Sequence, residues 1–135
     1  MRNKKIIYAN KLMNCLLITN PVDPQEQELF SLLQTHQIEY ETASDHMIAI
    51  QKAHQHLFDV VVLSAEKAEG NIDSAIRILK ECNPRVRIIV RTNANSRELE
   101  SRVRKENIFH YHVNSFGYQE LSTALSSALE LIKGH

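Results

Sequence analysis

Short apolar runs alternate along this chain with segments whose apolar residues recur at helical spacing. A short apolar run bounded by turn residues is typical of a buried strand, whereas apolar residues at positions i, i+3, i+4 and i+7 are typical of a helix packed on one face. The pattern predicts a helix after each strand. The strands are expected at residues 12–19, 38–43, 59–63, 86–92 and 108–113.

Capping residues indicate where the first two helices begin. Asp23 is expected to be an N-cap, Pro24 to occupy the first helical position, and Glu26 to close a capping box. Ser44 or Asp45 can cap the second helix.

The second and fourth helices are predicted to differ in how much apolar surface they bury. Met47, Ile50 and Leu57 are expected on the buried side of the second helix. Residues 95–98 form another capping box, and the helix that it opens is mostly charged. We therefore expect the fourth helix to be peripheral.

Regular alternation of strands and helices with short connections predicts right-handed crossovers and a parallel sheet covered on both faces. The near-continuous apolar strands three and four suit the centre of the sheet, and strands two and five suit its edges. The fold class predicted is α/β, a flavodoxin-like three-layer α/β/α sandwich with a five-stranded parallel sheet of order 2-1-3-4-5. Residues 12–133 are expected to form one domain after an N-terminal extension at 1–11, with no output domain.

Composition narrows the classes of function. The chain has 16 basic and 16 acidic residues, so no net charge favours nucleic acid or an anionic membrane as a partner. No apolar run is long enough to span a bilayer, and the predicted location is cytoplasmic. The two cysteines, Cys15 and Cys82, are expected to be free thiols.

Four local patterns together resemble a response-regulator receiver domain: LLITNP at 16–21, DVVVLS at 59–64, IIVRT at 88–92 and YHVNSF at 111–116. In that family two carboxylates and a phosphoacceptor aspartate hold Mg²⁺, and a hydroxyl and a lysine hold the phosphoryl oxygens. The resemblance places these roles on the following residues of this chain: Asn20, Pro21, Ser64, Thr92 and Asn114. Of these only Thr92 keeps the expected chemistry. The resemblance therefore implies a degenerate, or pseudo-receiver, without aspartyl phosphorylation and with weak Mg²⁺ binding.

Other residues near the strand ends have more than one interpretation. Arg91 precedes Thr92 and is predicted either to contact a small anion or a partner's carboxylate, or to extend from the strand end towards solvent. Ser64 would need an adjacent base to act as a nucleophile, and the sequence places none there. We expect no catalytic residue and no cofactor, so the protein is not predicted to be an enzyme.

His110 and His112 alternate on one face of the predicted fifth strand. Such a pair binds a borderline metal only when a third ligand joins, and the sequence shows none. An edge strand protected by polar side chains explains the two residues more simply, and no metal site is predicted.

The leading functional prediction is a signalling module of two-component, phosphorelay type that acts by protein contact. Its partner would be a kinase, a receiver, an output protein or a second copy in a homodimer. The resemblance places the interaction face on helix four, strand five and helix five, with Arg97, Arg102, Arg104, Tyr111 and Tyr118. The alternative is a domain that binds an anion, a nucleotide or a flavin at the strand ends, although the two prolines of residues 20–24 leave few N–H groups for a phosphate.

Overall fold

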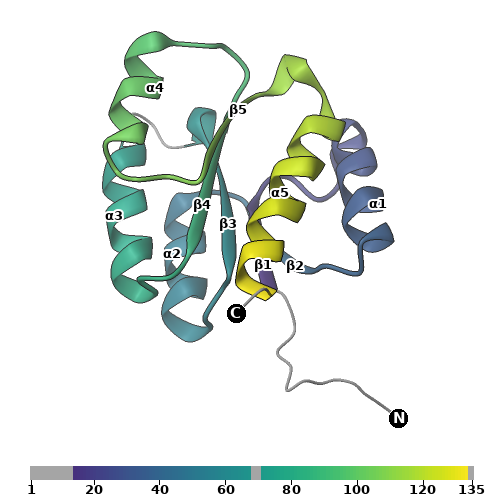
Figure 1. Ribbon diagram of the computed structural model, residues 1–135, viewed down its shortest axis with the longest axis horizontal. Coiled ribbons are helices and arrows are strands. Elements are labelled where there is room, and N and C mark those ends of the chain that lie inside the picture. The colour runs from purple at the N-terminus through teal and green to yellow at the C-terminus, as the bar shows by residue number, and fades with distance from the viewer. Residues whose placement is uncertain (1–13, 68–70, 134–135) are drawn as a thin grey trace.

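The computed structural model describes residues 14–67 and 71–133, so the predicted extension at 1–11 lies outside the described residues. Five parallel strands form one sheet in the order β2-β1-β3-β4-β5, as predicted (Figure 1). The strands are β1 (Asn14–Ile18), β2 (Glu39–Ala43), β3 (Val60–Ser64), β4 (Arg87–Thr92) and β5 (His110–Val113).

The helices cover both faces of the sheet and complete three layers (Figure 1). They are α1 (Gln27–Thr35), α2 (His46–Gln55), α3 (Ile72–Cys82), α4 (Arg97–Arg104) and α5 (Tyr118–Lys133). Helices α1 and α5 pack on one face, and α2, α3 and α4 pack on the other. Short 3₁₀ turns follow three of the strands: η1 (Pro24–Glu26), η2 (Ala65–Lys67) and η3 (Asn114–Phe116).

Burial along the strands follows their place in the sheet. Val60, Val61, Val62 and Leu63 of β3 are at most 1% exposed, because helices cover both faces of this central strand. The edge strand β2 alternates between exposed and partly buried residues until Ala43. The apolar runs that predicted the sheet therefore also indicated which strands lie at its centre.

The predicted buried side of α2 is wrong at two positions. Met47 and Leu57 are 66% and 65% exposed. Helix α2 instead buries His46, Ala49 and Ala53, a stripe of spacing three and four that lets the helix approach the sheet closely. Leu57 lies beyond the end of the helix, where helical spacing no longer applies.

The capping predictions are partly confirmed. Asp45 accepts a hydrogen bond from the backbone N–H of Ile48, so Asp45 rather than Ser44 caps α2. Helix α4 begins one residue later than predicted, because the hydroxyl of Ser96 accepts from the backbone N–H of Leu99. Asn95, the predicted cap, lies just outside that helix.

The two cysteines are free, as predicted, but they differ in environment. Burial, with a smaller contribution from the charge of Asp59, raises the pKa of the Cys15 thiol to about 12. Cys82 is half-buried at the end of α3. Within residues 14–67 and 71–133, no helix is both long enough and apolar enough to span a bilayer.

Candidate functional site

A cleft of about 610 Å³ opens where the strands reach their carboxyl ends. Three of the residues placed there by the sequence line it: Asn20, Ser64 and Asn114. The sheet register sets Ser64 directly beside Arg91 on the neighbouring strand. Parallel strands meet at this edge, which is why residues from distant parts of the chain share one cleft.

The centre of the cleft is an ion pair between Arg91, near the end of β4, and Glu26, at the end of η1. Nη1 of Arg91 lies 2.8 Å from Oε1 of Glu26, and Nη2 lies 3.0 Å from Oε2. Both residues are buried, at 6% and 8% exposed. This bidentate arrangement matches the planar guanidinium to the planar carboxylate, which makes it strong and directional.

Glu26 was predicted to close a capping box, and that prediction is wrong. Its carboxylate accepts hydrogen bonds from Arg91, from the Thr19 hydroxyl at 2.6 Å and from the Tyr118 hydroxyl. Burial alone would raise the pKa of Glu26, but these hydrogen bonds and the Arg91 charge hold that pKa below its ordinary value. Glu26 is therefore ionised at neutral pH and fully engaged by its neighbours.

Arg91 also contacts the residues at the start of η3 and α5. Its Nε donates to Oδ1 of Asn114 at 3.0 Å, and its guanidinium lies 5.8 Å from the centre of the Tyr118 ring. Asn114 in turn donates from Nδ2 to Oδ1 of Asn93 at 2.8 Å. Arg91 was predicted to contact an anion or a partner's carboxylate, or to extend towards solvent. The structure places it against a carboxylate of its own chain.

Thr92 and Glu66 form a second polar contact at the rim of the cleft. The Thr92 hydroxyl donates to Oε2 of Glu66 at 2.7 Å, and the backbone N–H of Asn93 donates to the same oxygen at 3.0 Å. This contact ties the end of β4 to the turn that follows β3. The hydroxyl of Thr92, predicted to hold a phosphoryl oxygen in a receiver, is thus bonded to a carboxylate of its own chain.

Asn20 and Pro21, predicted to stand where a receiver carries its acidic pair, form an exposed turn. Oδ1 of Asn20 accepts from the backbone N–H of Val22 at 3.1 Å. Asp23 accepts from the backbone N–H of Gln25 at 2.9 Å and begins η1, as its predicted capping role requires. These side chains serve the local backbone, which accounts for the residue types present.

Sequence reasoning missed His46, which lies beneath Ser64. Nε2 of His46 is 3.1 Å from the backbone oxygen of Ser64, so the ring bonds the main chain rather than the serine hydroxyl. Burial, the largest effect, lowers the pKa of His46. The only sequence signal was its place at the start of a helix. The contact positions the end of β3 and does not by itself make Ser64 a nucleophile.

The cleft has carboxylates that the sequence analysis did not predict there, because Asp23, Glu26 and Glu66 line it. Each has a partner: a backbone N–H, Arg91 and Thr92, respectively. In the part of the chain that the structure describes, these carboxylates do not converge as a metal-binding group.

The five residues predicted for the interaction face differ in exposure and in their hydrogen bonds. The Tyr111 ring is 8% exposed, and its hydroxyl lies 3.4 Å from Asn95 and Ser96. The Tyr118 hydroxyl faces the cleft, through its bonds to Glu26 and the Gln25 carbonyl.

The three arginines of α4 differ in their ion pairs and in their exposure. Arg102 pairs with Asp73 at 3.3 Å, and Arg104 pairs with Glu100 at 2.8 Å. Arg97 lies exposed in the first turn of the helix. Arg97 and Arg104 are thus both exposed, whereas Arg102 is partly buried.

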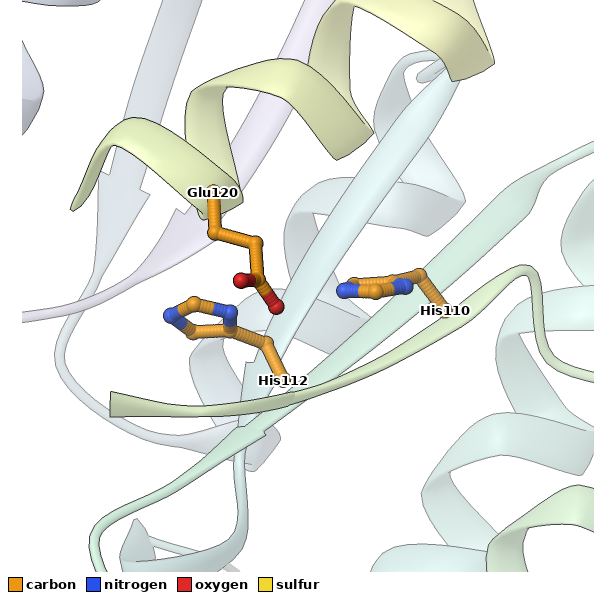
Figure 2. Close-up of side chains that lie close together, drawn as sticks. All are labelled: His110, His112 and Glu120. Atoms are coloured by element: carbon orange, nitrogen blue, oxygen red, sulfur yellow. The ribbon is translucent and has the colours of Figure 1, made fainter. Parts of the chain in front are cut away.

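His110 and His112 lie on the face of β5 that meets α5, and Glu120 of α5 joins them (Figure 2). Glu120 comes from a different element, so no local pattern around the two histidines pointed to this third side chain. One ligand atom from each residue lies within 4.8 Å of the others. The three residues, here called the histidine cluster, are separate from the lining of the cleft.

Comparison with known proteins identifies the fold but no relative by sequence. No protein-family model matches the chain, and no curated protein sequence matches it significantly. Solved structures match over most of the chain.

A response regulator receiver domain protein (CheY-like) from Methanospirillum hungatei superposes with a TM-score of 0.77 at 13% identity, over 93% of this chain and all of that one. A response regulator receiver domain protein from Clostridium thermocellum gives 0.74 at 23% identity, over 90% and 98%. A response regulator from Burkholderia pseudomallei, with a phosphorylated aspartic acid and a calcium ion, gives 0.67 at 20% identity, over 90% and 72%. The chain therefore has the fold of response-regulator receiver domains.

Proposed function

We propose that this protein is a receiver-like signalling module of two-component type that acts by protein–protein contact, without aspartyl phosphorylation and without catalysis. The observation that carries the proposal is the buried pair of Arg91 and Glu26 at the strand ends. A receiver that accepts a phosphoryl group needs a carboxylate nucleophile and a metal ion beside it. Here the strand-end position belongs to Ser64, and an internal cation–anion pair lies next to it.

The contrast with the Burkholderia pseudomallei structure supports this proposal. That protein holds a phosphorylated aspartic acid and a calcium ion. In the present chain the negative charge of Glu26 is paired with Arg91, and Glu66 accepts hydrogen bonds from Thr92 and Asn93. A divalent cation would have to displace these donors, and it would meet the positive charge of Arg91.

The alternative, a site for an anion, a nucleotide or a flavin, receives less support from this geometry. Three hydrogen bonds of Arg91 go to Glu26 and Asn114, and its charge is already balanced. The loop after β1 has prolines at 21 and 24, which have no N–H to offer a phosphate.

Phosphorylation by acetyl phosphate tests the first part of the proposal. We expect the intact mass of the protein to stay unchanged after incubation with acetyl phosphate and Mg²⁺. The variant Ser64→Asp should also stay unmodified, because the Arg91–Glu26 pair and the residues at Asn20 and Pro21 still supply no metal site.

A receiver with its aspartate intact is the positive control for that experiment, and Ser64→Asn is the matched variant without a carboxylate. An adduct of one phosphoryl group on the wild-type protein would overturn the proposal. An adduct on Ser64→Asp alone would show that a metal binds despite the ion pair.

The contact surface is tested by charge reversal on α4. We propose that the face of α4, β5 and α5 makes the contact, with a second copy of the chain as the first candidate partner. Arg97→Glu should weaken self-association at least about tenfold, because an exposed interface charge acts directly on association. Arg102→Glu and Arg104→Glu should weaken it too, with only small effects on folding because their ion pairs are half-exposed.

Arg85→Glu is the matched control, since Arg85 is exposed in the loop before β4 and belongs to none of the three elements of the proposed face. Sedimentation velocity over a range of concentrations measures the association. A monomer at all concentrations would exclude the second copy as partner, and an equal effect of Arg85→Glu would move the interface away from α4.

A further inference from the structure

We propose that His110, His112 and Glu120 form a binding site for one divalent transition-metal ion of the Zn²⁺ type. The inference does not rest on the proposed function, because the cleft and the histidine cluster share none of these residues. It rests on the geometry of three ligand-bearing side chains and on two nitrogen atoms without partners.

The fold brings the three side chains together from two elements. Alternation along β5 turns His110 and His112 towards α5, whereas Tyr111 and Val113 pack into the core on the other face. Glu120 lies in the first turn of α5. Figure 2 shows both rings turning a nitrogen towards the Glu120 carboxylate. The ring centres are 6.1 Å apart, and one ligand atom from each residue falls within 4.8 Å of the others.

The two histidines leave polar atoms unpartnered. Nε2 of His110 and Nδ1 of His112 are buried and make no hydrogen bond. His112 is only 1% exposed. Buried polar atoms almost always have a partner, and leaving one without a bond destabilises the folded protein. A metal ion held between the rings would give both atoms a partner at once.

One negative charge and two positive charges lie near the two rings. Glu120 acts on both histidines, whereas Arg104 acts on His110 and Arg91 acts on His112. The Glu120 carboxylate supplies the negative charge that a cation would need at this place.

The ligand set favours one class of ion. Two imidazoles and one carboxylate suit Zn²⁺ and related borderline ions, whereas Mg²⁺ and Ca²⁺ prefer oxygen ligands alone. Bonds of about 2.0–2.2 Å in a tetrahedron place ligand atoms about 3.3 Å apart. The side chains would therefore close by up to roughly 1.5 Å from their present spacing, and the exposed Glu120 has the rotational freedom to do most of this. Three protein ligands leave a fourth position for water.

Zinc titration of the tag-free full chain tests this site. Competition with a chromophoric chelator gives the stoichiometry and affinity, and Co²⁺ absorption reports the geometry. We expect one Zn²⁺ per chain, an intense tetrahedral Co²⁺ spectrum and a rise in melting temperature with Zn²⁺. Glu120→Gln and His110→Asn should each weaken binding at least about tenfold and remove the rise. Both residues are more exposed than His112, so these variants should fold.

Two matched controls separate this site from other ligands on the chain. His36→Asn changes an exposed histidine at the end of α1 and should leave binding unchanged. Cys82→Ser removes a thiol that lies 3.6 Å from His54, and it should also leave binding unchanged. The proposal would be overturned if zinc binding survived Glu120→Gln and His110→Asn, or if Cys82→Ser abolished it. It would also be overturned if the wild-type protein failed to compete with the chelator for Zn²⁺.

Discussion

The strand-end cleft and the histidine cluster both gather polar side chains, but they differ in how those side chains are bonded. In the cleft, Arg91 and Glu26 bond each other, and Glu66 bonds Thr92. In the cluster, His110 and His112 each leave a buried nitrogen without a partner. The charged side chains of the first region are paired with one another, whereas the second region leaves two ligand-bearing nitrogens of neighbouring rings unbonded.

The difference shows why the position of a site in a fold is a poor guide to its chemistry. The cleft lies where this fold places ligands, yet its charges are paired within the chain. The cluster lies on an edge strand, and two of its ring nitrogens have no hydrogen-bond partner. Substitutions that break the ion pair of the cleft should therefore lower the stability of the protein. Replacing a histidine of the cluster should leave the stability unchanged or raise it.

The largest effect is expected from Glu26→Gln. This change leaves the Arg91 guanidinium buried without its counter-charge, which should lower the free energy of unfolding by about 3 kcal/mol. Chemical denaturation of the metal-free protein measures it. The double variant Glu26→Gln with Arg91→Met removes both charges and should recover most of the loss. If the double variant is no more stable than Glu26→Gln alone, the ion pair is not what stabilises the cleft.

The same pair should make stability depend on acid pH. Despite burial, the bonds from Arg91, Thr19 and Tyr118 keep the pKa of Glu26 lower in the folded protein than in the unfolded chain. The unfolded chain therefore binds the proton more readily. The stabilisation from Glu26 is complete at pH values above its ordinary pKa of 4.5. It is lost as the pH falls through the lower pKa that Glu26 has in the folded protein.

The measurement for this prediction is the free energy of unfolding as a function of pH for the wild-type protein and Glu26→Gln. The difference between the two should narrow steadily below pH 4.5. A difference that stays constant down to the acid limit would mean that Glu26 is not ionised in the native cleft.

The smallest effect is expected from His112→Phe in metal-free protein. A phenyl ring fills a similar space and removes the unpartnered Nδ1, so stability should be unchanged or should rise by up to about 1 kcal/mol. The same variant should lose the melting-temperature response to Zn²⁺. A large loss of stability in the absence of metal would show that the ring of His112 already has the partner it needs.

The sequence predicted the layers of the fold because they depend on local patterns. The apolar run at 60–63 could only form a buried strand, and the alternation with helices fixed a parallel sheet. The errors arose where tertiary packing outweighed local spacing. Met47 and Leu57 are apolar and near the second helix, but small residues let that helix approach the sheet on another side.

The site was predicted less well, because its contacts join distant residues. Glu26 had a plausible local role as a capping residue, and only the folded sheet brings it to Arg91, which is 65 positions away. Glu120 likewise joins the histidines through the packing of α5 on β5. The sequence predicted which strand ends line the cleft, but the contacts made there could be found only in three dimensions.

The unequal environments of the two cysteines make the protein convenient to label. The Cys15 thiol is fully buried and stays protonated well beyond the pH of common coupling reactions, whereas Cys82 is within reach of solvent. A maleimide dye added to the native protein should therefore attach once, at the end of α3, without prior mutation. A fluorophore at that position would report on the helices of one face while leaving both the cleft and the histidine cluster untouched.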